Sequence, residues 1–114
     1  MLVKNETRGQ VLMTRGELAS TFWARLCGLM GRSALESETG LILKGDKSIH
    51  SFFMRFPIDV IYADQDWRVV RVDPAMPPNR IGPFVLRSTY VVELPAGVIQ
   101  ATGTAVGDQL VVQS

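Results

Sequence analysis

The sequence contains only one cysteine, Cys27, and one histidine, His50, among its 114 residues. A single cysteine cannot form an intramolecular disulfide, and it supplies too few thiolates for a structural zinc site. The fold is therefore expected to be stable in a reducing compartment. A chain of this length buries roughly two thirds of its surface on folding, which suffices for a hydrophobic core, so we expect a single domain over residues 1–114.

The sequence also lacks a strong excess of either charge and a long apolar run. Its 12 basic and 11 acidic residues nearly balance, whereas domains that bind nucleic acid usually gather a basic excess on one face. No run approaches the 18 apolar residues of a membrane-spanning helix, and the N-terminus turns polar within four residues. We predict no nucleic-acid partner, no membrane span and a cytoplasmic location, or an exported one if a leader has been removed.

The apolar pattern predicts short strands separated by turn residues along most of the chain. The predicted strands are residues 2–4, 10–13, 40–43, 49–53, 58–63, 67–72, 84–86, 89–94 and 109–113. Pro57 interrupts the longest apolar run, because proline lacks an amide donor and restricts the residue before it. The two segments beside Pro57 are therefore predicted to form a hairpin. Residues 73–83 hold four of the six prolines and predict a long loop without regular structure.

One main helix is predicted over about residues 15–28. Thr14 and Glu17 have the spacing of a capping box, and apolar residues then recur at three- and four-residue intervals. Residues 96–103 can form one or two further helical turns. Together these elements predict a mostly β (α+β) fold, either an antiparallel β-sandwich of jelly-roll type or a partly closed barrel, with the main helix against one face or end.

The run Ile49–Ala63 is the longest apolar stretch, and it carries His50, Arg55 and Asp59 among aromatic and branched neighbours. A metal site built on His50 and Met54 requires the two side chains to meet. In a strand, four residues span roughly 13 Å, so one ion cannot bridge them. We therefore predict no metal site and no cofactor.

Two carboxylates, Asp59 and Glu93, each stand in the middle of an apolar predicted strand. Burial of an unpaired carboxylate is costly and raises its pKa, so each must find a partner or face a cleft. They could converge as the acid and base of a hydrolase or lyase, with His50 moving protons. Alternatively, each accepts from backbone amides or pairs with an arginine, without any catalysis.

A thiolate nucleophile formed by Cys27 and His50 is disfavoured, because Cys27 lies on or beside the apolar face of the predicted helix, where thiols are buried and inert. The sequence has no glycine-rich phosphate loop, nucleophile elbow or paired metal-ligand motif. These absences weigh against an enzyme.

Four segments together resemble the domain-of-unknown-function family 192, a family of uncharacterised bacterial and archaeal proteins. The segments are RLCGLMGR (residues 25–32), IHSFFMRFPIDVIYAD (residues 49–64), VVELPAG (residues 91–97) and GD (residues 107–108). The resemblance implies a small, mostly β fold with a helix, and no established activity. Trp67 departs from the family pattern, because it stands where relatives usually carry a glycine. Many relatives also begin with an export signal, which this sequence lacks.

The sequence therefore predicts a small binding domain, for a small polar ligand or a protein partner, with a pocket near His50, Arg55 and Asp59. Met54, Glu93 and Arg80 are predicted to lie at or behind the rim of this pocket. Aromatic residues could line a shallow groove there. These are Phe52, Phe53, Phe56, Tyr62, Trp67 and Tyr90. The alternatives are the hydrolase or lyase described above, and a structural or interaction protein without a ligand site.

Overall fold

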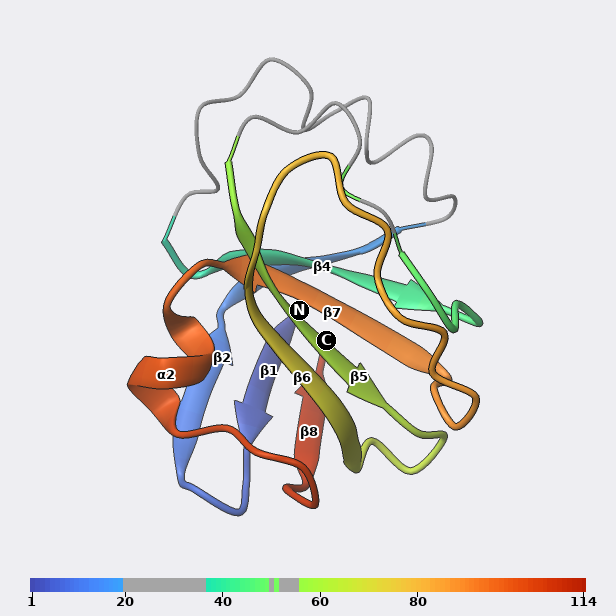
Figure 1. The fold of residues 1–114 in the computed structure, drawn as a ribbon. Coiled ribbons are helices and arrows are strands. Elements are labelled where there is room, and N and C mark those ends of the chain that lie inside the picture. The colour runs from blue at the N-terminus through green and yellow to red at the C-terminus, as the bar shows by residue number, and fades with distance from the viewer. Residues whose placement is uncertain (20–36, 50, 52–55) are drawn as a thin grey trace.

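The computed structural model describes residues 1–19, 37–49, 51 and 56–114. These residues form eight strands in two sheets and one short helix (Figure 1). The predicted mostly β fold is confirmed.

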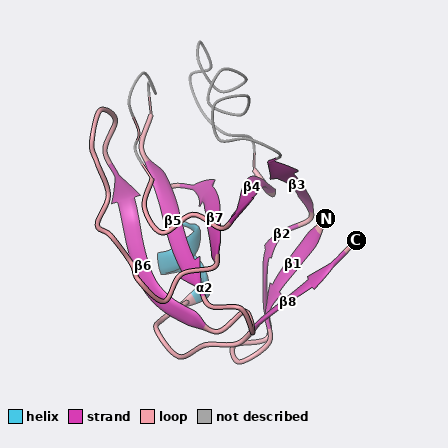
Figure 2. Ribbon diagram, turned by 90° about the vertical axis from the view of Figure 1, so that its right-hand side faces the viewer, coloured by secondary structure: helices cyan, strands magenta, loops and turns pink. Residues whose placement is uncertain are grey.

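The smaller sheet joins the two ends of the chain. Its strands are β1 (Leu2–Asn5), β2 (Gln10–Met13) and β8 (Leu110–Gln113), in the antiparallel order β2-β1-β8. Leu2 pairs with Gln113, so the N- and C-termini lie side by side (Figures 1 and 2). The strands predicted at residues 2–4, 10–13 and 109–113 are thus confirmed to within one or two residues.

The larger sheet has five strands in the order β3-β4-β7-β5-β6. The strands are β3 (Arg15–Ala19), β4 (Thr39–Lys44), β5 (Ile58–Ala63), β6 (Val69–Met76) and β7 (Tyr90–Pro95). All neighbouring strands are antiparallel except β3 and β4, which are parallel. The strands predicted at residues 58–63 and 67–72 correspond to β5 and β6, which pair with each other as antiparallel neighbours.

The predicted start of the main helix is wrong. Arg15–Ala19 is a strand, and it pairs residue by residue with β4 from Thr39 to Leu43. The capping-box spacing of Thr14 and Glu17 is local, and pairing with a distant apolar strand overrides it. Residues 20–28 of the predicted helix lie outside the described residues. A five-residue helix, α2 (Val98–Thr102), forms where helical turns were predicted, and no helix in the described residues is long and apolar enough to cross a membrane.

The predicted hairpin between residues 49–53 and 58–63 is also wrong, because β6 and β7 occupy both edges of β5. Of the first segment, Ile49 and Ser51 are described, and they bond to the loop after β6. The amide of Ser51 donates to the carbonyl of Arg80, and the amide of Gly82 donates to the carbonyl of Ile49, each at 2.8 Å. Residues 84–86, predicted as a strand, lie in the same loop.

Strand β6 continues to Met76, through the first part of the predicted loop at residues 73–83. Pro74 is tolerated because β6 is an edge strand and because the ladder is irregular there. Val60 pairs with Asp73 and Ile58 with Met76, so one extra residue is accommodated in β6. Ala75 takes a positive φ of 53° in this bulge.

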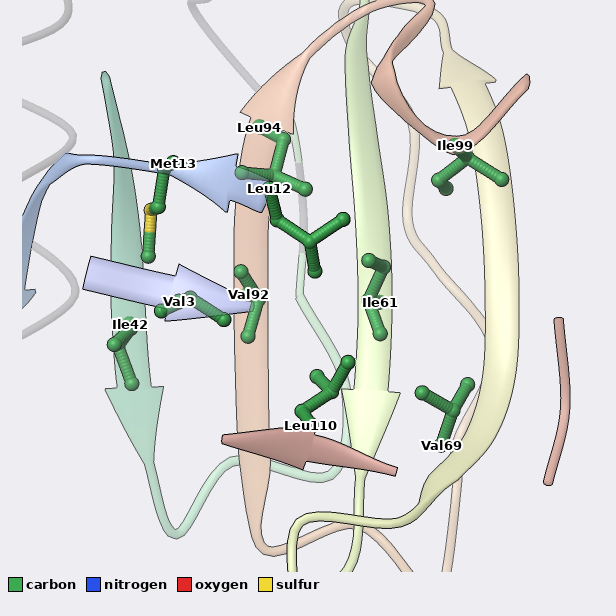
Figure 3. Packing of buried hydrophobic residues seen from close by; sticks show 10 residues of the cluster. All are labelled: Val3, Leu12, Met13, Ile42, Ile61, Val69, Val92, Leu94, Ile99 and Leu110. Carbon is green, nitrogen blue, oxygen red and sulfur yellow. The ribbon is translucent and has the colours of Figure 1, made fainter. Parts of the chain in front are cut away.

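The hydrophobic core between the two sheets is closed at one side by α2, which contacts both β2 and β6. Figure 3 shows side chains from both sheets meeting in this core, together with Ile99 of α2. The buried residues of this core are Val3, Leu12, Met13, Ile42, Ile61, Val69, Val92, Leu94, Ile99 and Leu110.

The opposite face of the five-stranded sheet is buried as well, under two segments that we call the covering loops: residues 45–51, as far as they are described, and residues 77–89. Ile49 and Val85 from these loops pack with Phe56 on Val60 and Tyr62 of the sheet. Strands buried on both faces have continuous rather than alternating apolar sequences. This explains the runs GLIL and IDVIYA in β4 and β5.

Trp67 has a positive φ of 63°, so the position where relatives carry glycine does require the left-handed region. The carboxylate of Asp64 holds this turn by accepting from the amides of Asp66 and Arg68. The ring of Trp67 stacks on Tyr90, with centroids 3.8 Å apart. Such a stack contributes about 0.5–1.5 kcal/mol, which offsets part of a backbone strain of about 1–2 kcal/mol.

Gly40→Ala is expected to lower the free energy of unfolding by about 1–3 kcal/mol, because the new Cβ would lie 2.6 Å from the carbonyl oxygen of Glu93 in the paired strand β7. Gly16→Ala is the matched control. Its Cβ also meets atoms closer than 3 Å, but these are the flexible end of the Met13 side chain. Urea unfolding of both variants should show the larger loss for Gly40→Ala, and equal losses would contradict the packing around Gly40.

Candidate functional site

Asp59 is fully buried in β5, and backbone amides satisfy its carboxylate. One oxygen, Oδ1, accepts from the amide of Ala75 at 2.8 Å. The other, Oδ2, accepts from the amides of Gly97 at 3.1 Å and Ile99 at 2.8 Å. Of the two structural partners considered for Asp59, amides or an arginine, the described residues provide the amides.

These three hydrogen bonds join parts of the chain that are distant in sequence. The amide of Ala75 is presented by the bulge in β6, and the amides of Gly97 and Ile99 belong to the turn that starts α2. Gly97 takes a φ of 103°, a conformation that favours glycine. Both oxygens of Asp59 are therefore engaged in holding the fold, so we assign Asp59 no contact with a ligand.

Asp59→Asn is expected to lower the free energy of unfolding by about 2–4 kcal/mol. The asparagine replaces one of the two carboxylate oxygens with an NH₂ group, so the buried backbone amides that bond to that oxygen lose their acceptor. Asp66→Asn is the control, since Asp66 is exposed. Urea unfolding would measure both, with the m-value unchanged. A loss below about 0.5 kcal/mol for Asp59→Asn would show that its hydrogen bonds matter little.

Glu93 projects to the opposite face of the sheet from Asp59. Glu93 in β7 pairs with Val60 in β5, and paired residues of antiparallel strands project to the same face. Asp59 directly precedes Val60, so its side chain projects to the other face. A layer of sheet therefore separates the two carboxylates, and the predicted convergence of Asp59 and Glu93 as an acid–base pair is wrong.

The carboxyl group of Glu93 is buried among apolar neighbours. Glu93 is 2% exposed, and its paired neighbours are Leu41 on β4 and Val60 on β5. No amide or side chain of the described residues donates a hydrogen bond to it. Burial, followed by the negative charge of Asp46, raises the pKa of Glu93 to about 7. Near neutral pH the protonated form of this carboxyl group is therefore accessible beside the ionised form, so it can either donate or accept a hydrogen bond.

Tyr62 brings a second buried polar group to the same face. It is fully buried, and among the described residues its hydroxyl has no hydrogen-bond partner. Burial and the charge of Asp73 are the main causes that raise the pKa of Tyr62 to about 12, and the charge of Glu93 adds to them. The hydroxyl lies against Gly82, where a Cβ would come within 3.0 Å of it. Gly82 thus allows the covering loop to approach the phenol closely.

The covering loops over Glu93 and Tyr62 are held together by polar contacts. The hydroxyl of Ser51, which is fully buried, donates to the carbonyl of Pro77 at 2.6 Å and accepts from the amide of Arg80 at 3.0 Å. The ammonium of Lys47 donates to the carbonyls of Leu86 and Ser88 at 2.9 and 2.8 Å. The face that carries Glu93 and Tyr62 therefore lies under an ordered cover.

A third polar cluster, at the turn before β8, is fully satisfied. Asp108 accepts from Arg8, from Asn5 and from the amide of Ala105. Burial alone would raise the pKa of Asp108, but these hydrogen bonds outweigh it and hold that pKa below its ordinary value. Asn5 also donates to Thr104. This cluster joins the β1–β2 hairpin to the C-terminal strand and leaves no group for a ligand.

The remaining predicted site residues divide between two groups. Arg80 is exposed on a covering loop, where its backbone bonds to Ser51. His50, Met54 and Arg55 lie outside the described residues, so their part in a site stays a prediction. Cys27, for which the sequence disfavours a catalytic role, also lies outside them.

The described aromatic residues do not line one groove, because Phe56 and Tyr62 pack under the covering loops whereas Trp67 and Tyr90 pack on the core between the sheets. Tyr62 was predicted only as one of these aromatic residues. Its position in the apolar run IDVIYA gives no signal that its hydroxyl is unpartnered.

Glu93→Gln is expected to change how stability depends on pH. The pKa of Glu93 is about 7 in the fold and about 4.5 in the unfolded chain, so the folded protein holds the extra proton between these values. The stability that protonation gives the wild type is complete below about pH 4.5 and is lost as the pH rises through about 7. The loss amounts to roughly 3 kcal/mol.

The measurement is urea unfolding of the wild type and Glu93→Gln from about pH 4.5 to about pH 8. The variant should lack the decline, so its stability relative to the wild type should rise by this amount over the interval. Parallel profiles for the two proteins would mean that Glu93 has an ordinary pKa in the fold.

Comparison with known proteins agrees with the fold and identifies the family. The profile of the family DUF192, Uncharacterized ACR, matches residues 3–112. A UPF0127 protein of Thermococcus sibiricus is 34% identical over 110 residues, which cover 93% of this chain and 71% of that protein. A UPF0127 protein of Pyrococcus horikoshii is 33% identical and is covered to 96%, as is this chain.

A crystal structure of a protein of unknown function from Novosphingobium aromaticivorans resembles this fold with a TM-score of 0.79 and 25% identity, over 97% of this chain and 82% of that one. The predicted resemblance is confirmed. On the family match and the identity of these relatives, the chain belongs to the DUF192 family of uncharacterised proteins.

Proposed function

We propose that this protein binds a small, hydroxyl-bearing ligand on the covered face of the five-stranded sheet, with Glu93 and Tyr62 as its polar contacts. The observation that carries the proposal is the buried hydroxyl of Tyr62, which has no hydrogen-bond partner among the described residues, on the same face as the buried carboxyl group of Glu93. Buried polar groups in folded proteins are almost always hydrogen-bonded, and each exception calls for an explanation. A bound ligand would supply the missing partner.

The chemistry of the two groups favours a polyol or sugar over a cation or an apolar molecule. Tyr62 offers a hydroxyl donor, and Glu93 at neutral pH offers a donor or an acceptor. A ligand hydroxyl can donate to one and accept from the other. Tyr62 pairs with Val91, two residues from Glu93. Such diagonal positions place Cβ atoms about 7–8 Å apart, so a ligand with several hydroxyl groups would span them.

The same proposal includes four residues that the sequence predicts at the pocket or its rim. His50, Met54, Arg55 and Arg80 would be further contacts of the ligand. An apolar pocket with a few polar groups is the usual form of a small-ligand site. The sequence also predicts a protein partner as the other possible occupant of the pocket near His50, Arg55 and Asp59. The hydrolase or lyase built on Asp59 and Glu93 is not proposed again, because the sheet separates these residues.

The proposal predicts that a panel of monosaccharides and polyols contains compounds that raise the melting temperature of the wild type. A ligand at a hundred times its Kd stabilises a protein by about 2.7 kcal/mol, which thermal unfolding detects readily. Glu93→Gln and Tyr62→Phe should each reduce this shift, whereas the control Asp66→Asn should retain it. Tyr62→Phe removes only an unpartnered hydroxyl, so the variant should fold at least as stably as the wild type.

Two results would contradict the proposal. One is a panel in which no compound shifts the melting temperature of the wild type. The other is a shift that survives in both Glu93→Gln and Tyr62→Phe, which would place the binding elsewhere. For the compound that raises the melting temperature most, isothermal titration measures the Kd of the wild type and of each variant.

A further inference from the structure

A groove lies beside β6, the edge strand of the five-stranded sheet, between this strand and a covering loop. Val70, Arg71 and Val72 of β6 form one wall, and residues 84–87 of a covering loop form the other. Val106 also lines the groove. The groove has a volume of about 630 Å³, within the range of ligand-binding clefts. Neither Glu93 nor Tyr62 lines it.

The backbone of β6 is unevenly protected along this edge. At its start, Val69 bonds on the outer side to Gly107 and Asp108, which closes that part. At its end, Pro74 and the bulge at Ala75 interrupt any regular pairing. Between these two ends, no strand of the described residues pairs with the outer edge of Val70–Val72 (Figure 2). This is the part of β6 that lines the groove.

Three of the side chains that line the groove are large, apolar and exposed to water. Phe84, Leu86 and Val106 are 71%, 72% and 63% exposed. Large apolar side chains exposed singly are ordinary, but three around one groove form a patch of the kind that marks an interaction site.

The charges on the groove are positive on both walls. Arg71 on β6 is exposed and bonds through Nε to Asp73 at 2.9 Å. Arg87, on the opposite wall, has no carboxylate partner among the described residues. An occupant with carboxylates would meet Arg87 directly and could share Arg71 with Asp73, whereas a basic occupant would be repelled from both walls.

From this arrangement we propose that the groove docks an extended peptide segment of a partner protein, with apolar and acidic side chains in alternation. The peptide lies along the edge of Val70–Val72, where strand addition can satisfy backbone groups of both chains. Its apolar side chains pack on Phe84, Leu86 and Val106, and its carboxylates face Arg71 and Arg87. A second copy of this chain is a poorer occupant, because symmetric pairing of two β6 strands about this segment would bring Arg71 close to its own copy.

The test is a phage library of random twelve-residue peptides, selected on the wild-type protein and counter-selected on the double variant Leu86→Ser and Arg87→Glu. Both positions are exposed, so the double variant should fold as the wild type does, which circular dichroism and urea unfolding would check. The proposal expects enrichment of peptides that alternate apolar residues with aspartate or glutamate. No enrichment, or enrichment of basic peptides, would overturn it.

Fluorescence anisotropy of the most enriched peptide would then separate the two contributions. Arg87→Glu is expected to weaken binding at least tenfold and to make the affinity less dependent on salt. Leu86→Ser should also weaken it, whereas Ile81→Ser, an equally exposed apolar residue that does not line the groove, should leave the Kd unchanged. A Kd that Leu86→Ser and Arg87→Glu leave unchanged would place the peptide elsewhere.

A replacement of the central peptide residue by proline, which removes a backbone donor, should weaken binding if the peptide pairs with β6. Equal binding of the proline peptide would overturn the strand-addition geometry. Self-association of the wild type in sedimentation, abolished by Leu86→Ser, would overturn the choice of occupant in favour of a second copy. Binding here is independent of Glu93, so Glu93→Gln should retain it whether or not the small-ligand proposal holds.

Discussion

Burial of the five-stranded sheet on both of its faces constrains the rest of this structure. One face packs on the smaller sheet and α2, and the other lies under the covering loops. A polar side chain on an inner strand of this sheet is therefore buried whichever face it takes. Asp59 in β5 and Glu93 in β7 are both buried in this way, but their carboxyl groups have different surroundings.

Asp59 faces the layer that contains α2, where a bulge and a helix start present backbone amides within reach. Its charge is compensated by three hydrogen bonds, and the same bonds fix the position of α2 relative to β6. Glu93 faces the covering loops, where the described residues offer it no donor, and burial raises its pKa. A carboxylate that accepts three backbone hydrogen bonds and one that receives none from the described residues thus occur one residue apart in register, on opposite sides of one sheet.

The two proposed binding surfaces rest on different observations. On the covered face, Glu93 and Tyr62 are buried polar groups without partners among the described residues, which favours a small polar ligand. At the sheet edge, exposed apolar side chains and a segment of unpaired strand lie between two arginines, which favours an acidic, extended peptide. The family is uncharacterised, so these observations, rather than an activity known for relatives, are the basis for assigning a role to the chain.

The sequence by itself determined most strands, because runs such as IDVIYA are long, apolar and bounded by turn residues. It also identified Asp59 and Glu93 as carboxylates that need partners. Only the tertiary structure decided which face each takes, since this depends on the register between β5 and β7, about thirty residues apart. The same holds for Arg15–Ala19, whose helical capping pattern yields to pairing with β4, and for Pro74, which an edge strand can accommodate. Local patterns fix local conformation, whereas register and edge position arise from contacts between distant segments.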